Sequence, residues 1–304
     1  MTRSTIWMTL AALGLVATAS MCVLTQARVP PVPPNPGAPP GLGLVPSFAE
    51  TFDGTTLDTD RWRTSYFGQR GVTAPVNQRT LPTNGERQLY FDPGFLNLGV
   101  QPFTVGNGVL TITARRMSPG VLAATRQAVA TLPADQRNGP IARTLYQSGM
   151  ITTHGTFSQT YGYFEMRARL PAGKGLWPAF WMLPEDNSWP PEIDIMEMLG
   201  DKPATVYMTV HSRVQPKSGK PIEVAGPPGA FHRYGALWLP DRIDYYLDGV
   251  KTFTTATPAD AHKPMHLLAN LAVGGYWPGD PDAGTVLPAR MEIDSIRAWR
   301  LPVR

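Results

Sequence analysis

The chain contains almost no cysteine: Cys22 is the only one in 304 residues. One thiol cannot form an intramolecular disulfide, and a cysteine-based zinc site is excluded. Charged residues are also sparse, at 16% of the chain, and the formal net charge of +4 is scattered rather than gathered into a run of Lys and Arg. Nucleic acid, whose phosphates attract such runs, is therefore not an expected partner.

Several motifs are absent as well. The chain has no G-x-S-x-G elbow, no P-loop and no dinucleotide-binding fingerprint, which argues against a serine hydrolase and against a nucleotide-dependent enzyme. No internal repeat is evident. The length and the 42% of hydrophobic residues are sufficient for a large folded domain with its own core.

Residues 1–27 have the pattern of a secretory signal: a basic residue at Arg3, an apolar stretch from Ile6 to about Leu24, and small residues after it. Cleavage is expected after Ala19 or after Ala27, which predicts a secreted or periplasmic protein. The apolar stretch also approaches the roughly 20 residues that span a bilayer. An uncleaved anchor that tethers the protein to a membrane is therefore the alternative.

Residues 28–46 contain eight prolines in nineteen positions, which favours an extended linker over a folded element. We expect the folded domain to occupy residues 47–304, since no later linker divides it. Short alternating segments bounded by turn residues recur in this domain and predict an antiparallel β-sandwich. These segments are 108–114, 161–170, 205–211, 242–249 and 290–299. Residues 118–132 are the exception, because helical spacing follows an N-cap at Ser118 and a proline at Pro119.

Three carboxylates fall within six residues, Glu192 to Glu197, in a segment that alternates like a β-strand. On a regular strand Glu192 and Asp194 share one face and Glu197 points to the other. One extra residue bulging out near Ile195 and Met196 would return Glu197 to the face of the other two. The flanking residues are apolar or stiff, and carboxylates in such surroundings are unfavourable unless they are used.

Such a strand can cleave a glycosidic bond with retention, which needs two carboxyl groups about 5–5.5 Å apart. With the bulge, the Cα atoms of Glu192 and Glu197 are about 13 Å apart, so strand curvature and side-chain reach must bring the carboxyl groups together. We assign Glu192 as nucleophile, Glu197 as general acid/base and Asp194 as the assisting group between them. The triplet by itself does not establish which glutamate has which role.

The chain resembles glycoside hydrolase family 16, whose laminarinase-like branch has a catalytic strand of the form Glu-x-Asp-x-x-Glu. Residues 161–169, 175–181 and 268–279 also match motifs of that family. The resemblance covers roughly residues 47–304. It implies an all-β, concanavalin-like jelly roll of two curved antiparallel sheets, with a substrate cleft on the concave face. It also implies that Glu192 is the nucleophile and Glu197 the acid/base.

Sugar rings pack on aromatic side chains, and their hydroxyls need polar partners, so a glycan-binding cleft should combine both. Trp177 and Trp181 share a strand face, and the resemblance implies that they line the subsites beside the catalytic strand; a core role for one of them is the alternative. Trp189 lies in the loop that enters the catalytic strand. His211 matches a position near the scissile bond, where it would contact a sugar hydroxyl or Asp194, or else satisfy a backbone group.

The remaining candidates lie in loops or at strand ends. The resemblance places Asn84 and Arg87 on the non-reducing side of the cleft, although Asn84-Gly85 is also an ordinary turn sequence. Asn270 and Trp277 match the rim on the reducing side. No cofactor is expected for the reaction. The resemblance implies a structural calcium ion on the convex face, held by Asp294 with help from Glu50, and an exposed strand aspartate is the alternative.

Together these observations predict a retaining endo-glycosidase that hydrolyses internal β-linkages of β-1,3- or β-1,3-1,4-glucan. The expected partner is the polysaccharide substrate, and the protein is expected to act as a monomer. An exopolysaccharide depolymerase and a transglycosylase of the same family are alternatives. A non-catalytic carbohydrate-binding module is a weaker one, because it has no use for three buried carboxylates.

Overall fold

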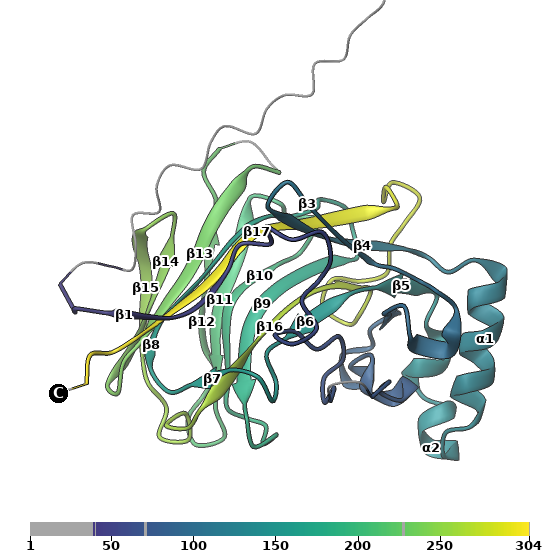
Figure 1. Ribbon diagram of the computed structural model, residues 1–304, viewed down its shortest axis with the longest axis horizontal. Helices are drawn as coiled ribbons and strands as arrows, with labels where there is room; N and C mark the ends of the chain where they lie inside the picture. Colours follow the sequence, from purple (N-terminus) through teal and green to yellow (C-terminus); the bar gives the residue numbers. More distant parts are fainter. Residues whose placement is uncertain (1–38, 40, 70–71, 227–228, 304) are drawn as a thin grey trace, which may run out of the picture. The chain divides into compact units, whose positions relative to one another are not determined.

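Two β-sheets pack face to face in the computed structural model, which describes residues 39, 41–69, 72–226 and 229–303 (Figure 1). Among the described strands the pairing is antiparallel except for one short parallel pair, β2 with β5. The prediction of an all-β jelly-roll sandwich is confirmed, and Figure 1 shows the marked curvature of the sheet that contains β9, β10 and β16.

The larger sheet has ten strands, in the order β15-β14-β13-β8-β17-β4-β5-β2, with β1 paired to β17 and β3 to β4. Their bounds are β1 Val45–Glu50, β2 Gln88–Tyr90, β3 Phe103–Gly106, β4 Val109–Arg116, β5 Tyr146–Ser148, β8 Gly162–Arg169, β13 Phe231–Trp238, β14 Arg242–Leu247, β15 Val250–Ala256 and β17 Ala289–Arg300.

The smaller sheet has seven strands, in the order β12-β11-β10-β9-β16-β6, with β7 paired to β16. Their bounds are β6 Met150–Thr152, β7 Ser158–Gln159, β9 Leu176–Pro184, β10 Glu192–Met198, β11 Thr205–His211, β12 Ser218–Glu223 and β16 Met265–Val273. All five alternating segments and the catalytic strand predicted from the sequence are therefore strands.

The core lies between the sheets and follows from the alternation of apolar residues. In β17, Met291 and Ile293 face the core, and the pairing with β8 shifts register between Ile293 and Ser295. Because of this shift, the core-facing residues change from odd-numbered (Met291, Ile293) to even-numbered (Ile296, Ala298), and all four lie in the same core. A bulge thus keeps a long strand apolar on one side while the sheet bends.

Helix α1, Pro119–Ala130, confirms the helix predicted at residues 118–132. Its N-cap is Ser118, whose hydroxyl accepts a hydrogen bond from the Val121 amide at 3.4 Å. A short second helix, α2 Ala134–Arg137, follows. Val129 and Met117 pack in a separate apolar cluster with Phe91 of the segment after β2, so this excursion has its own small core. The described residues also contain four 3₁₀ turns: η1 Val76–Gln78, η2 Pro82–Asn84, η3 Phe95–Asn97 and η4 Pro140–Arg143.

The predicted signal segment, residues 1–27, and most of the predicted linker lie outside the described residues. Strand β1 begins at Val45, two residues before the predicted start of the domain. Within the part of the chain that the structure describes, no helix has the length and apolarity needed to cross a bilayer.

Candidate active site

Strand β10 contains the bulge that the acidic segment predicts. Glu192, Asp194 and Glu197 lie opposite His211, Thr209 and Tyr207 of β11, which are regularly spaced two residues apart, although the step from Asp194 to Glu197 is three residues. The extra residue arises because Ile195 and Met196 are both fully buried in the core between the sheets. The three carboxylates therefore share one face of the seven-stranded sheet, which we call the acidic face.

The same face continues across β9 and β16. Asp194 lies opposite Trp181 of β9, and Trp181 lies opposite Leu268 of β16. Two residues along each strand, Ala179 and Asn270 form the next pair. The acidic face thus combines carboxylates, indoles and an amide on adjacent strands, which is the mixture predicted for a glycan-binding surface.

Glu197 is buried and accepts a hydrogen bond from the indole of Trp177 at 3.1 Å. Trp177 is held in turn by Trp277, whose ring packs edge-on against it with centroids 5.4 Å apart. Trp277 also contacts Tyr207, the residue opposite Glu197, at 4.9 Å between ring centroids. Trp177, Trp277 and Tyr207 thus place aromatic rings around the carboxyl group of Glu197, the predicted acid/base. Trp277 is 42% exposed, so this aromatic cluster is accessible to solvent on one side.

Glu192 accepts a hydrogen bond from the indole of Trp189 at 2.6 Å. Trp189 is 59% exposed and comes from the loop before β10, as the sequence predicts. An exposed tryptophan whose N–H contacts the predicted nucleophile has no packing role to explain it.

Asp194 lies between the two glutamates and is almost completely buried. Its Oδ2 atom is 3.2 Å from Nε2 of His211, which also lies 3.9 Å from Oε1 of Glu192. The contact between Asp194 and His211 does not have hydrogen-bond geometry, and that carboxylate oxygen has no hydrogen-bond partner among the described residues. The histidine is therefore close to the pair Glu192 and Asp194, as predicted.

Burial is the main influence on the acidity of these groups. It raises the pKa of Glu192 and of Asp194 well above the usual range; the Asp194 carboxyl adds to the effect on Glu192, and the charge of Glu197 adds to the effect on Asp194. Burial, followed by the charge of Glu192, raises the pKa of Glu197 to about 7. The Glu192 carboxylate is the least buried of the three, and the Trp189 hydrogen bond acts against burial by lowering its pKa. Burial lowers the pKa of His211, which favours a neutral imidazole.

Lys217 belongs to this site and was missed by the sequence reasoning. It is exposed and immediately precedes β12. Gly219 of β12 lies opposite Thr209 on the acidic face, and Lys217 is two residues before Gly219, so it lies on the same side of the sheet. Its ammonium group lowers the pKa of Asp194, of Glu197 and of His211. Nothing in the local sequence identifies it, because its position depends on how the loop after β11 folds back.

Trp181 differs from Trp177 in its surroundings. It is 7% exposed, and its indole donates a 2.7 Å hydrogen bond to the side-chain carbonyl of Asn270, whose amide donates to Tyr90 at 3.0 Å. Tyr66 packs edge-on against the same indole. Trp181 and Asn270 therefore form a buried polar-aromatic part of the acidic face, and Trp177 is the more accessible of the two indoles.

Asn84 and Arg87 lie beside the loop between β16 and β17. The backbone carbonyl of Asn84 accepts a hydrogen bond from the Tyr276 amide at 2.8 Å, and its side chain donates to the buried Glu86. Arg87 lies 3.4 Å from Asp280. The structure thus places both residues next to the loop that carries Trp277, with their side chains engaged by acidic partners.

The predicted calcium ligands are also engaged with protein groups. Asp294 pairs with Arg167. Glu50 accepts hydrogen bonds from the amides of Thr51 and Phe52 through one oxygen and from the indole of Trp62 through the other. Both carboxylates therefore have partners within the protein.

Buried carboxylates held by indoles on a curved antiparallel sheet define a carbohydrate-processing class of site. The comparisons agree with this class. A family model described as "Glycosyl hydrolases family 16" matches residues 101–296, and the chain belongs to that family.

Among curated proteins, the chain is 44% identical over 262 residues to "Endo-1,3-1,4-beta-glycanase ExsH" of Rhizobium meliloti, a match that covers 85% of this chain and 52% of that protein. It is 39% identical over 264 residues to "Endo-1,3-1,4-beta-glycanase EglC" of the same organism, with the same coverage. The chain thus spans about half the length of these relatives.

Among solved structures, the catalytic domain of an endo-1,3-beta-glucanase (laminarinase) from Thermotoga petrophila superposes with a TM-score of 0.68 at 30% identity. That match covers 86% of this chain and 99% of the other. A laminarinase from Rhodothermus marinus gives a TM-score of 0.66 at 29% identity, covering 86% of this chain and 98% of the other.

Proposed function

We propose that the protein is a retaining endo-glycosidase that hydrolyses internal β-linkages of β-1,3- or mixed β-1,3-1,4-glucans. The observation that carries the proposal is the bulge in β10, which gathers Glu192, Asp194 and Glu197 on one face. The names of the relatives, endo-glycanases and laminarinases, support the substrate class.

In the first step, the ionised Glu192 attacks the anomeric carbon and the bond from that carbon to the leaving oxygen breaks. Glu197 donates its proton to the leaving oxygen. A pKa of about 7 keeps Glu197 protonated up to neutral pH, so it can act as the acid. The product of this step is a glycosyl ester of Glu192.

In the second step, Glu197 is a carboxylate and takes a proton from a water molecule, whose oxygen attacks the anomeric carbon and releases Glu192. Asp194 lies between the two glutamates on the acidic face and is assigned a positioning role. Its charge also raises the pKa of Glu192. His211 lies within 4 Å of Glu192 and of Asp194 and is proposed to position these two carboxyl groups. If a sugar hydroxyl replaces water in this step, the same residues perform transglycosylation.

The substrate face is proposed to include Trp177, Trp277 and Trp189, the three indoles that border the carboxylates with an accessible side. Asn84, Arg87 and His211 are proposed to contact sugar hydroxyls at the ends of the site. Trp181 and Asn270 are proposed to shape the floor through their mutual hydrogen bond.

We also propose that the protein is exported as a monomer, secreted or periplasmic, and that residues 1–27 are either cleaved or kept as a membrane tether. The sequence pattern of that segment supports this proposal. The structural calcium ion remains a prediction; its test is a change in melting temperature on addition of a chelator.

The central test is a digest of laminarin, lichenan, agarose and an acidic exopolysaccharide by the wild-type protein and by Glu192→Gln, with product sizes measured over time. We expect endo cleavage of at least one β-linked polymer, seen as mid-sized products early in the digest. Removal of the nucleophile should lower the rate by about three orders of magnitude or more.

Glu223→Gln is the matched control, because Glu223 is an exposed carboxylate at the end of β12, and its rate should be unchanged. A wild-type protein that binds laminarin but cuts none of the four polymers would instead support the carbohydrate-binding module. A product with an added acceptor sugar would identify transglycosylation.

A further inference from the structure

Trp189 lies in a segment that cannot continue the strand after it. The pairing of β10 with β11 ends at Glu192 and His211. The two residues before Glu192 are Pro190 and Pro191, which have no backbone N–H and cannot extend the ladder. Trp189 comes next and is 59% exposed, so packing does not fix its ring either. Contacts from other segments are therefore needed to keep the indole on the Glu192 carboxylate.

The guanidinium of Arg213 makes one such contact. It donates a hydrogen bond to the backbone carbonyl of Trp189. Arg213 lies in the loop that follows β11, and its side chain is exposed, so the core does not hold it. Where the guanidinium lies is therefore set by the backbone of that loop.

Asp260, in the connection between β15 and β16, fixes the backbone at Arg213. One carboxylate oxygen accepts a hydrogen bond from the Arg213 amide at 2.8 Å, and the other accepts one from the Ser212 hydroxyl at 2.8 Å. The Ser212 oxygen accepts hydrogen bonds in turn from the amides of Val214 and Gln215, at 3.0 and 3.2 Å. The loop after β11 is thus tied to a segment that is distant in the sequence.

The same β15–β16 connection also holds the residue before Trp189. The ammonium of Lys263 lies 3.0 Å from the Asp186 carboxylate and 3.1 Å from the Ser188 hydroxyl oxygen. Asp186 accepts hydrogen bonds from the amide and the hydroxyl of Ser188, at 3.0 and 2.6 Å. One connection therefore supports Ser188 directly and, through Arg213, the carbonyl of Trp189.

We propose that Arg213, held by Asp260, is a positioning residue that keeps the Trp189 indole on the nucleophile and so orients the Glu192 carboxylate for attack. Burial raises the pKa of Glu192, and the 2.6 Å hydrogen bond from the indole counteracts this rise. An indole released by loss of Arg213 makes this bond less often, so the pKa of Glu192 should increase. The inference rests on the proposed function, since it concerns the first step of that reaction.

The test compares the wild-type full chain with Arg213→Met, which removes the donor and keeps much of the side-chain length. Because Glu192 must be ionised to attack, the acidic limb of kcat/KM against pH reports its pKa. We expect this limb to move upward by roughly 0.5–1 pH unit and the maximal kcat/KM to fall about tenfold. Arg213→Lys keeps a donor and should recover most of both losses.

A double-mutant cycle separates positioning from a direct effect of the arginine charge. In a protein that carries Trp189→Phe there is no indole N–H to position, so adding Arg213→Met should move the limb no further. A direct field of the guanidinium would persist in that background, and an equal shift there overturns the proposal. Asp260→Ala should move the limb in the same direction as Arg213→Met, and an unmoved limb would exclude the role of Asp260.

The matched control is Arg300→Met, which removes an exposed arginine at the end of β17 on the other sheet and should leave the limb in place. Loss of folded protein lowers the rate at every pH and does not move the limb. A uniform fall in rate for Arg213→Met therefore overturns the positioning role. Every single variant keeps the other titratable groups near Glu192, which are Asp194, Glu197, His211 and Tyr66.

A second measurement needs no turnover. The carboxyl carbon of Glu192, assigned in the NMR spectrum by comparison with Glu192→Gln, is titrated in the wild-type protein and in Arg213→Met. Its pKa should be higher in the variant, and an equal pKa overturns the proposal. Failure of the proposed function is a separate result: the wild-type protein would cut none of the four polymers, while this titration would still respond to Arg213→Met.

Discussion

Three carboxylates of the ten-stranded sheet and the two glutamates of the acidic face have different partners. On the ten-stranded sheet, Asp294 pairs with Arg167, Glu292 pairs with Arg169, and Asp244 lies 3.1 Å from Arg242. On the acidic face of the seven-stranded sheet, Glu192 and Glu197 are held by neutral indole N–H groups.

The difference in partners explains the difference in chemistry. An arginine fixes a carboxylate in its ionised form and reduces its ability to take up a proton or attack carbon. An indole supplies one hydrogen bond and no charge, so burial dominates and the pKa rises. Asp294, Glu292 and Asp244 thus contribute ion pairs to the fold, whereas Glu192 and Glu197 lack an arginine partner among the residues that the structure describes.

Among the variants that test this difference in carboxylate partners, Glu197→Gln is expected to have the largest effect, on the rate of hydrolysis. Without the acid, hydrolysis of a polymer should slow by about 10²- to 10⁴-fold, the usual contribution of a general acid. An aryl β-glucoside oligomer with a good leaving group needs no proton in the first step and should lose far less. Steady-state rates on both substrates measure the contrast. Equal losses on the two would contradict the assignment of Glu197 as the acid.

The second effect concerns stability. Below a pH of about 4.5 the Glu197 carboxyl is neutral in the folded and unfolded states, and as pH rises through its folded pKa of about 7 the buried charge makes unfolding more favourable. Glu197→Gln should therefore equal the wild type in free energy of unfolding near pH 4 and exceed it at pH 8. The gain should be at most roughly 3 kcal/mol, because each pKa unit corresponds to about 1.4 kcal/mol.

Denaturant unfolding at both pH values measures that gain, with Glu292→Gln as control. Glu292 is paired with Arg169 and should show no gain at pH 8. A wild type that is more stable than Glu197→Gln at pH 8 would mean that the carboxylate is stabilised in the fold, contrary to its surroundings.

A third effect should appear in the pH dependence of the rate. Glu197 must be protonated for the first step, so kcat/KM should fall as pH rises above about 7. Lys217 lowers the pKa of Glu197, and Lys217→Gln should move this alkaline limb upward, by less than about one pH unit because the ammonium is exposed and screened. Lys217→Arg should leave the limb in place. A downward shift in the Gln variant would exclude the electrostatic role.

The smallest effect is expected on the ten-stranded sheet. Arg169→Gln removes the partner of Glu292, and the arginine is 43% exposed, so the free energy of unfolding should fall by about 0.5–1 kcal/mol. The value of kcat should not change. A fall in kcat without a change in melting temperature would show that the pair of Arg169 and Glu292 on the ten-stranded sheet affects the active site on the seven-stranded sheet.

Local features of the fold and site could be predicted from the sequence. The bulge in β10 follows from two adjacent apolar residues, Ile195 and Met196, inside an alternating acidic segment, because both must be buried in the same core. Helix α1 is equally local, since Ser118 and Pro119 mark its start. Trp177, Trp189 and His211 lie beside the carboxylates because their strand and loop positions are fixed relative to β10.

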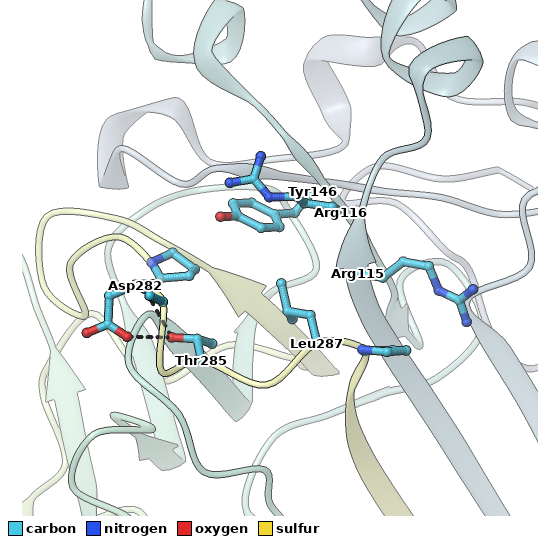
Figure 2. A pocket seen from close by; sticks show the side chains of 9 residues that line it. Arg115, Arg116, Tyr146, Asp282, Thr285 and Leu287 are labelled. Carbon is cyan, nitrogen blue, oxygen red and sulfur yellow. Dashed lines mark hydrogen bonds between the residues drawn. The ribbon is translucent and has the colours of Figure 1, made fainter.

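The features that the sequence did not predict depend on contacts between distant segments. Lys217 reaches the acidic face only because the loop after β11 returns to pair as β12. Asn270 binds Trp181, 89 residues away, and the pairing of Arg87 with Asp280 joins two loops. No local sequence pattern predicts such contacts, because each of these segments contains several polar residues that could form them. The pocket between β4, β5 and residues 281–288 is of the same kind, because residues far apart in the sequence form it (Figure 2).

The hydrogen bond from Trp189 to Glu192 makes that indole an optical reporter of turnover. An ester formed on the carboxylate changes the group that the indole N–H contacts, and an indole that is 59% exposed responds in its emission to such a change. Stopped-flow fluorescence, with a Trp189→Phe protein to subtract the other seven tryptophans, would then separate the formation of the covalent species from its breakdown.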